Sequence, residues 1–206
     1  MTDTIHQLTY SEPPLSRDEI LRYAGVKMGG EELSHIISEV LTTVLPGLRY
    51  KVVYKEIPII CRGACVDFGF YTAESRSLMT NLSGCDRVVL FAATVGTHID
   101  RAILRYSAIS DTKALIAEAV GTERIEALCD TFTEDIRHKY SAMGYKARPR
   151  FSPGYGDLPL EMQREIFRQL DPAGKIGLTL NSSLLMSPSK SVTAIIGLER
   201  VNGTPC

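Results

Sequence analysis

RFSPGYGD, residues 150–157, and MSPSKSV, residues 186–192, are the two most distinctive segments of this sequence. Pro153 fixes the backbone of the first segment, and Gly154 places no side chain there, so a flat ligand can come close to the main chain. Arg150 can hold a carboxylate with a two-pronged hydrogen bond. Residues 150–157 therefore predict a binding loop for a small molecule.

Together the two segments resemble the reactivation domain of cobalamin-dependent methionine synthase. In that family an Arg-x-x-x-Gly-Tyr stretch binds S-adenosylmethionine, and a Met-x-Pro-x-x-Ser-Val segment leads into a strand. The resemblance is most specific over residues 120–198, and residues 90–100 are similar to the strand, Thr-x-Gly turn and helix of stand-alone relatives. It implies an α/β (α+β) fold with a twisted, largely antiparallel sheet and flanking helices. We expect a single domain over residues 1–206, with a helical N-terminal part at 1–47 and the core at 48–206.

The resemblance also implies a ligand site. Arg150 would bind the methionyl carboxylate of S-adenosylmethionine, and Glu126, on the preceding helix, would face the amino group or ribose. The backbone of residues 152–155 would contact the adenine edge, and Tyr155 would flank the ligand. A single arginine near a turn, or a single glutamate on an amphipathic helix, is usually only solvated, so the order of the motifs carries the argument. The predicted site residues are Glu126, Arg150, Ser152, Gly154 and Tyr155.

The implied reaction is the reductive methylation of cobalamin that has reached the inert Co(II) state, with S-adenosylmethionine as the methyl donor. The sequence lacks the Asp-x-His-x-x-Gly cobalamin-binding motif of methionine synthase. The resemblance therefore implies a partner, either a cobalamin-binding methionine synthase core or another corrinoid protein, and a flavodoxin-like reductant. The chain would be an in-trans subunit of this methyltransferase in methionine biosynthesis. The alternative is a non-catalytic sensor of a nucleoside-like ligand, or a scaffold for a corrinoid protein.

Composition narrows the classes of protein. With 206 residues, 44% of them hydrophobic, the chain can bury one sizeable core. A net charge of −1 and a pI near 6.4 give no electropositive excess, which argues against a nucleic-acid partner. The number of cysteines is odd, at five, and we find no leader segment or long apolar run, so we expect a cytoplasmic protein without a membrane partner. The spacing of Cys61 and Cys65 predicts free thiols and no metal site.

Two helices are expected near the N-terminus. Ser16 can cap a helix that begins at Arg17, with Glu19 completing a capping box. Apolar residues at helical spacing predict a second helix over residues 33–44, which ends at Pro46-Gly47.

Further helices are predicted at residues 98–104, 122–140 and 159–170, each from an apolar stripe. Alternating residues at 50–55 predict a strand with one solvated face, whereas the continuous apolar run at 88–93 predicts a central strand covered on both faces. Residues 191–198 predict a β-branched strand. A Cys85/His98/Asp100 nucleophile set has little support, because no catalytic motif accompanies it.

Overall fold

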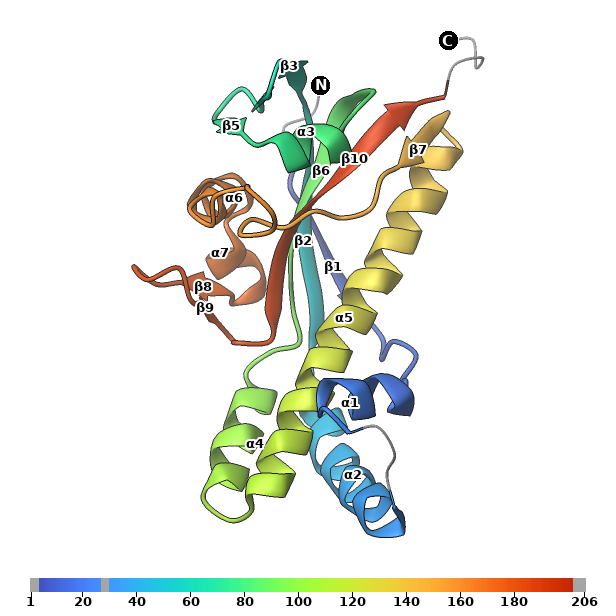
Figure 1. Cartoon of the computed structure of the whole chain (residues 1–206), viewed down its shortest axis with the longest axis vertical. Coiled ribbons are helices and arrows are strands. Elements are labelled where there is room, and N and C mark those ends of the chain that lie inside the picture. Colours follow the sequence, from blue (N-terminus) through green and yellow to red (C-terminus); the bar gives the residue numbers. More distant parts are fainter. Residues whose placement is uncertain (1–3, 27–29, 202–206) are drawn as a thin grey trace.

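A five-stranded sheet in the order β1-β2-β6-β10-β7 is the framework of the molecule, and every neighbouring pair in it is antiparallel. The computed structural model describes residues 4–26 and 30–201. The predicted α/β (α+β) class with a largely antiparallel sheet is confirmed (Figure 1). The strands are β1 (His6–Tyr10), β2 (Tyr50–Pro58), β6 (Cys85–Thr94), β10 (Ser191–Arg200) and β7 (Tyr145–Ala147).

The burial predicted from the sequence is correct for β6 and wrong for one face of β2. β6 is the central strand, and its run from Val88 to Ala93 is fully buried, as its continuous apolar pattern predicts. The solvated face predicted for β2 is wrong, because Val53 is fully buried and Lys55 is only 7% exposed. Helices cover this second face, and the Lys55 ammonium donates to the Gln169 side chain at 3.3 Å.

One face of the sheet is covered by α5 (Asp111–Ser141), and α1 (Arg17–Tyr23), α2 (Glu31–Val44) and α4 (His98–Ser107) pack against α5 and share its apolar core. A short 3₁₀ turn at Leu45–Gly47 follows α2, so the helix ends at Pro46-Gly47 as predicted from the sequence. Figure 1 shows α5 running along the sheet and continuing beyond it, into the end of the molecule that α1, α2 and α4 form. Phe132 of α5 anchors this layer, with its ring centroid 4.8 Å from that of Phe91 on β6.

The other face carries a second apolar core under shorter elements. Leu78, Met162 and Ile166 are fully buried there against β6 and β2. The elements are α3 (Arg76–Asn81), α6 (Met162–Leu170), α7 (Pro172–Ile176), a small sheet of β3 (Ile60–Arg62), β4 (Cys65–Asp67) and β5 (Thr72–Glu74), and the hairpin of β8 (Thr179–Leu180) and β9 (Met186–Ser187).

The N-terminal predictions are partly correct. α1 begins at Arg17, and the Ser16 hydroxyl accepts from the Glu19 N–H at 3.3 Å, as predicted. The second hydrogen bond of the predicted capping box, from the Ser16 N–H to the Glu19 side chain, is wrong. The Ser16 N–H donates instead to Glu123 of α5, at 2.9 Å. Strand β1 lies in the N-terminal segment for which we expected only helices.

The helix predicted at 122–140 begins much earlier, at Asp111, where the Ser110 side chain caps it. Gly121 lies inside this helix, and a Cβ at that position would be only 2.7 Å from the Ile99 side chain. Gly121 therefore permits the close packing of α4 on α5 and does not mark a helix end. The helix predicted from Pro159 begins at Met162, after a turn. None of the helices in the described ranges is long and apolar enough to span a membrane.

Candidate ligand site

The position of Arg150 is set by the backbone on both sides of it. The Arg148 N–H donates to the Gly197 carbonyl at 2.8 Å, and Phe151 and Ile195 exchange backbone hydrogen bonds of 2.8 and 2.9 Å. These bonds hold residues 148–151 against β10. Arg150, between the two anchors, extends toward α5 and reaches carboxylates there.

The second distinctive segment, residues 186–192, supports this arrangement from the sheet. It leads from β9 into β10, and the Ser191 hydroxyl lies 2.8 Å from both the Thr94 hydroxyl and the Pro188 carbonyl. Ser191 is buried, and these contacts fix the start of β10 against β6. The segment therefore helps to place the part of β10 that holds Phe151.

Arg150 joins two carboxylates of α5. Its Nη2 donates to Glu126 Oε2, and its Nη1 donates to Asp130 Oδ1 at 2.6 Å. Glu126 and Asp130 are four residues apart, so they lie on the same face of the helix. The Arg150 side chain is 25% exposed and the Glu126 side chain 37% exposed, so both partly face solvent. The structure thus brings together Glu126 and Arg150 of the predicted site.

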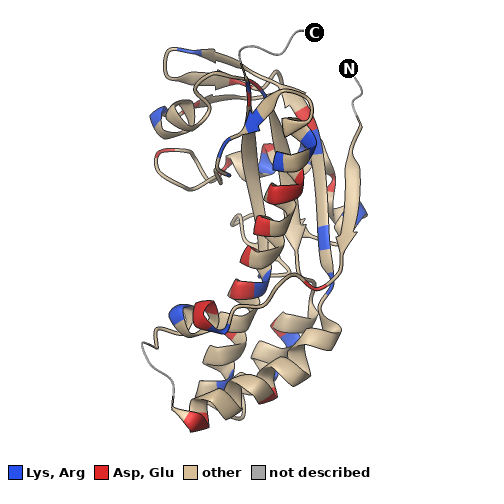
Figure 2. Ribbon diagram, turned by 90° about the vertical axis from the view of Figure 1, so that its right-hand side faces the viewer, with Lys and Arg blue, Asp and Glu red and all other residues tan. Residues whose placement is uncertain are grey.

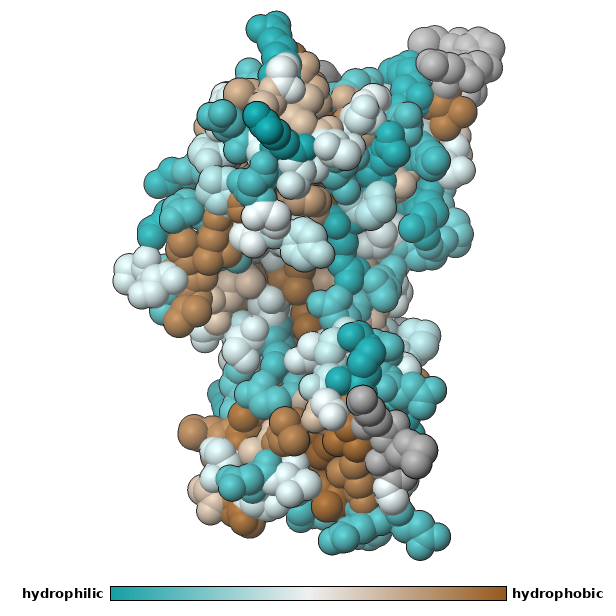
Figure 3. Space-filling model, viewed as in Figure 1, coloured by the Kyte–Doolittle hydropathy of each residue, from teal (hydrophilic) through white to brown (hydrophobic). Residues whose placement is uncertain are grey.

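A cavity of about 450 Å³ opens beside this cluster. Figure 2 shows acidic residues along the exposed side of α5, and Figure 3 shows hydrophilic residues where α1 approaches α5. The wall thus combines fixed charges of both signs with some apolar surface, as ligand pockets of small polar molecules do. The lining residues are Pro14, Ser16, Glu19, Arg22, Tyr23, Glu123, Glu126, Ala127, Asp130, Thr131 and Arg150.

The predicted Ser152, Gly154 and Tyr155 form the turn that follows Arg150. Gly154 has φ of +85°, which favours glycine, and a Cβ there would lie 3.0 Å from the Leu160 side chain. The Tyr155 N–H donates to the Ser152 carbonyl at 3.1 Å, and the Gly154 N–H donates to the Leu158 carbonyl at 2.9 Å. Tyr155 is 71% exposed. In the described part of the chain, these three residues lie beyond the cavity lining, next to Arg150 along the chain.

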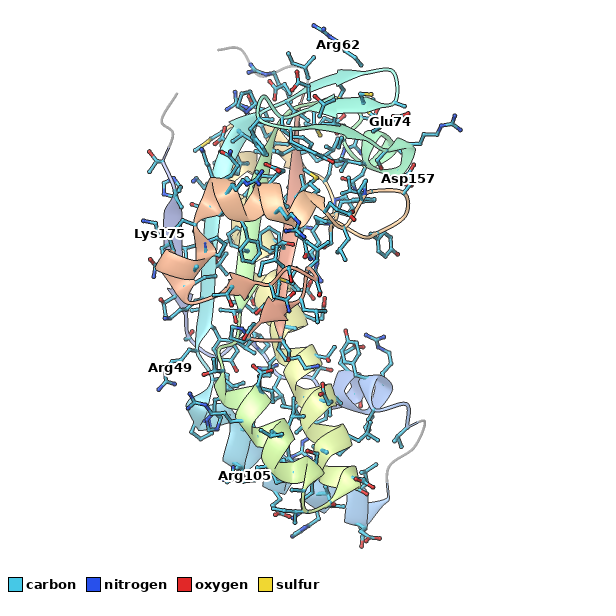
Figure 4. The ribbon with its side chains drawn as sticks, turned by 90° about the vertical axis from the view of Figure 1, so that its left-hand side faces the viewer. Arg49, Arg62, Glu74, Arg105, Asp157 and Lys175 are labelled. Atoms are coloured by element: carbon cyan, nitrogen blue, oxygen red, sulfur yellow. The ribbon has the colours of Figure 1, made fainter. Side chains whose placement is uncertain are left out.

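Asp157 fixes the far end of this turn, at the start of α3 (Figure 4). Its carboxylate accepts from the Ser75 hydroxyl at 2.5 Å and from the N–H groups of Arg76 and Ser77 at 2.8 and 3.1 Å. The Ser75 hydrogen bond, followed by these backbone bonds, holds the pKa of Asp157 well below its usual range. The Arg150–Asp157 loop is therefore fixed at both ends, by β10 and by α3.

α1 contributes a wall of the cavity that the sequence did not predict. Glu19 and Arg22 form an ion pair there, and the Arg22 guanidinium lies 4.2 Å from the centre of the Tyr23 ring. No local pattern shows that α1 packs on α5, because the two helices are far apart in sequence. Asp130 was recognisable on the face of α5 that carries Glu126, but nothing in the sequence placed it against Arg150.

The rejected nucleophile set lies elsewhere, whereas Cys129 is buried on α5 close to Arg150, Glu126 and Asp130. Cys61, Cys65, Cys85 and Cys129 are free thiols, and burial raises the pKa of Cys85 to about 11. Cys85 is the first residue of β6, whereas His98 and Asp100 lie in α4, beyond the other end of that strand. The length of β6 therefore separates Cys85 from the other two members of the set. Within the described ranges there is no group of three or more His, Cys, Asp or Glu residues that could hold a metal ion.

The chain matches the family model "Vitamin B12 dependent methionine synthase, activation domain" over residues 78–200, more than half of its length. It therefore belongs to this family, as the two sequence motifs suggested. A solved structure of the MetH reactivation domain bound to AdoHcy has the same fold, with a TM-score of 0.68 and 14% identity. The match covers 98% of this chain and 80% of that one. No curated protein matches the chain.

Proposed function

We propose that the cavity between α1 and α5 binds S-adenosylmethionine, and that the chain supports reductive methylation of cobalamin held by a separate methionine synthase core or corrinoid protein. The proposal rests on one observation above all: a member of an activation-domain family has its motif arginine beside an acidic helix face and an open cavity. A reductant of the flavodoxin type would supply the electron.

Arg150 is suited to the carboxylate of the ligand. A guanidinium carries five N–H donors in one plane, and each of its two terminal nitrogens has a second N–H besides the one used by Glu126 or Asp130. The α5 carboxylates hold the guanidinium in position, which lowers the entropy lost when a ligand binds. Glu126 remains close enough to accept a hydrogen bond from the ligand's ammonium group, and Ser152, Gly154 and Tyr155 extend the site along the chain.

The contribution of this chain to the reaction would be proximity and orientation. The donor's methyl group must point at the cobalt of the partner, and bound geometry converts that encounter into an effectively unimolecular step. Cobalamin bound to the partner would supply the nucleophile after one-electron reduction, and the methyl donor would leave as a neutral thioether. Arg150 and Glu126 would hold the amino-acid end of the donor still while this happens.

Isothermal titration calorimetry tests the binding step. Wild-type protein should bind S-adenosylmethionine, and Arg150→Ala should bind it much more weakly. Arg148→Ala is a matched control, because Arg148 lies on the same segment with similar exposure but pairs with Glu199, away from the cavity. Loss of binding in both variants, or in neither, contradicts the assignment of Arg150.

The second candidate is a sensor or scaffold without methyl transfer. The open cavity favours ligand binding in either case, so binding alone does not separate the two. A protein that binds S-adenosylmethionine and docks on a cobalamin-loaded methionine synthase core, but leaves its Co(II) spectrum unchanged under reducing conditions, would be a sensor or scaffold.

A further inference from the structure

A second cavity, of about 220 Å³, lies where β2 begins, beside the turn that leads from β6 into α4. It shares no residue with the cavity between α1 and α5. Two cationic side chains, Arg49 and Lys51, line it, and among the described residues no acidic side chain joins them there. The whole chain has a net charge of −1, so this pair of cations is a local feature and not a result of composition.

The backbone places both cations beside the same turn. Lys51 pairs with Thr94 in the β2-β6 ladder, and the Arg49 N–H extends this ladder by donating to the Val95 carbonyl at 2.9 Å. Side chains two residues apart on a strand lie on the same face, so Lys51 shares the face of Val53, on the side of the sheet away from α5. Figure 4 shows Arg49 at the edge of the molecule, where the sheet meets the helical end. The two cations therefore flank the entry into α4.

Within residues 4–26 and 30–201 neither cation forms an ion pair. Lys51 is only partly exposed, and its ammonium has no hydrogen-bond partner among those residues. Nη1 of Arg49 donates to the carbonyls of Pro46 and Leu48 at 3.2 and 2.7 Å, which are uncharged, so the guanidinium charge is not neutralised. A partly desolvated ammonium without a counter-ion is unfavourable, and an anion in the cavity would satisfy it.

Neutral donors complete the cavity. Thr97 lines it and is the N-cap residue of α4, and its side chain makes no capping hydrogen bond. The N–H groups of the first turn carry the positive end of the helix dipole. Asp100, the acid of this turn, accepts instead from the N–H and hydroxyl of Ser189 at 3.2 and 2.5 Å. The cavity has about half the volume of the one beside Arg150, so it suits a compact anion with several acceptor atoms.

We propose that this cavity binds a phosphate group, as the free ion or at the end of a phosphate ester, with Lys51 and Arg49 as its charged contacts. A phosphate group carries more than one negative charge near neutral pH and has several strong acceptor oxygens. It can therefore engage both cations and the start of α4 together. Bound there, it connects β2 to α4 and α7, so the folded protein gains stability from phosphate independently of S-adenosylmethionine.

Isothermal titration calorimetry with inorganic phosphate, and with methyl phosphate in parallel, tests the proposal. Wild type should bind at least one of the two, and should melt at a higher temperature in its presence than in sodium chloride of equal ionic strength. Tighter binding of methyl phosphate would identify a phosphate ester as the ligand, and tighter binding of the inorganic ion would identify free phosphate.

Two variants remove the charges one at a time. Lys51→Met, which keeps the length of the side chain without its charge, should weaken phosphate binding about tenfold or more, because a charge-assisted hydrogen bond is lost. Arg49→Gln should weaken it in the same direction. Lys146→Met is the matched control. Lys146 lies on β7, outside this cavity, and has no ion-pair partner in the described ranges, so its loss changes the net charge equally but should leave binding unchanged.

A wild-type protein that gives no heat with either phosphate, and no stabilisation beyond that of sodium chloride, would overturn the proposal. Unchanged binding by Lys51→Met and Arg49→Gln, with melting temperatures that show both to be folded, would also overturn it, and so would equal weakening by Lys146→Met. Each of these results leaves the S-adenosylmethionine proposal standing, because the two cavities share no residue.

Discussion

Two arginines that pair with carboxylates of α5 have opposite environments. Arg124 is fully buried, donates to Glu123 through Nε and Nη2, and also donates to the carbonyls of Pro13 and Pro14 at 2.8 and 2.7 Å. Arg150 is a quarter exposed and meets its two carboxylates at the edge of a cavity. Both are charged groups with acidic partners, but only Arg150 is open to a ligand, because Arg124 is fully enclosed by its protein contacts.

The comparison separates a structural ion pair from a binding one. Arg124 and Glu123 join α5 to the N-terminal segment, because Glu123 also accepts from the Ser16 N–H. They hold α1 in place as one wall of the cavity. Arg150 instead forms part of the opposite wall. A paired arginine is therefore a candidate for ligand binding only where solvent reaches it.

Arg124→Ala should have the largest effect, on stability. The change leaves Glu123, which is 3% exposed, as an uncompensated buried charge, at a cost of about 3 to 5 kcal/mol in the free energy of unfolding. Urea unfolding followed by circular dichroism measures it. Arg137→Ala removes an exposed pair with Glu134 on the same helix and should cost about 0.5 kcal/mol or less. Equal losses in the two variants would remove the distinction between Arg124 and the exposed arginines.

Arg150→Ala should act on binding. Loss of a charge-assisted hydrogen bond to the ligand should cost about 1.5 to 3 kcal/mol of affinity for S-adenosylmethionine. The free energy of unfolding should change by about 1 kcal/mol or less, because exposed ion pairs contribute little. Calorimetry and urea unfolding measure the two quantities on one preparation. A large loss of stability with unchanged affinity would place Arg150 in the same class as Arg124.

Glu126→Gln should produce a smaller change in affinity. The amide keeps the size of the side chain but removes the charge that we propose pairs with the ligand's ammonium, so binding should weaken roughly tenfold, or 1.4 kcal/mol. The melting temperature should stay close to that of wild type, since Glu126 borders the buried stripe of α5. A marked fall in melting temperature at unchanged affinity would instead make Glu126 structural.

Asp157→Asn should produce the smallest effect, visible in the dependence of stability on pH. The folded-state pKa of Asp157 is depressed, so its contribution is present above the ordinary value of 3.8 and is lost as pH falls through the folded pKa. The difference in unfolding free energy between wild type and Asp157→Asn should therefore be largest near neutral pH and shrink in acid. Asp18→Asn, on an exposed side chain, serves as the control. A difference that stays constant with pH would show that the carboxylate does not fix the loop.

Periodicity and composition predicted much of the fold. The buried β6 run, the β10 strand and the start of α1 follow from patterns that depend on nearby residues. β2 was misassigned as half solvated because its lysines suggested a wet face, whereas Lys55 is covered by α6. The start of α5 was predicted too late because Gly121 lies inside the helix. A glycine occurs there because close contact with Ile99 of α4 requires a small residue.

The candidate site was predictable only in part. The motif around Arg150 and the preceding helix identified Arg150 and Glu126, which the structure brings into contact. Glu19, Arg22 and Tyr23 could not be found in the same way, because the segment that leads into α1 is held to α5 by a hydrogen bond from the Ser16 N–H to Glu123 and another from Arg124 to the Pro13 carbonyl. Neither contact leaves a periodic signal in the sequence.

One measurement tests the central claim directly. The protein is mixed with a methionine synthase core that lacks its own activation domain and carries cobalamin as Co(II), with a flavodoxin-type reductant and S-adenosylmethionine, and the cobalamin spectrum is followed. The account predicts conversion of Co(II) to methyl-Co(III), at a rate that Arg150→Ala greatly reduces and Arg148→Ala does not. An unchanged Co(II) spectrum with wild-type protein that binds both S-adenosylmethionine and the core would contradict it.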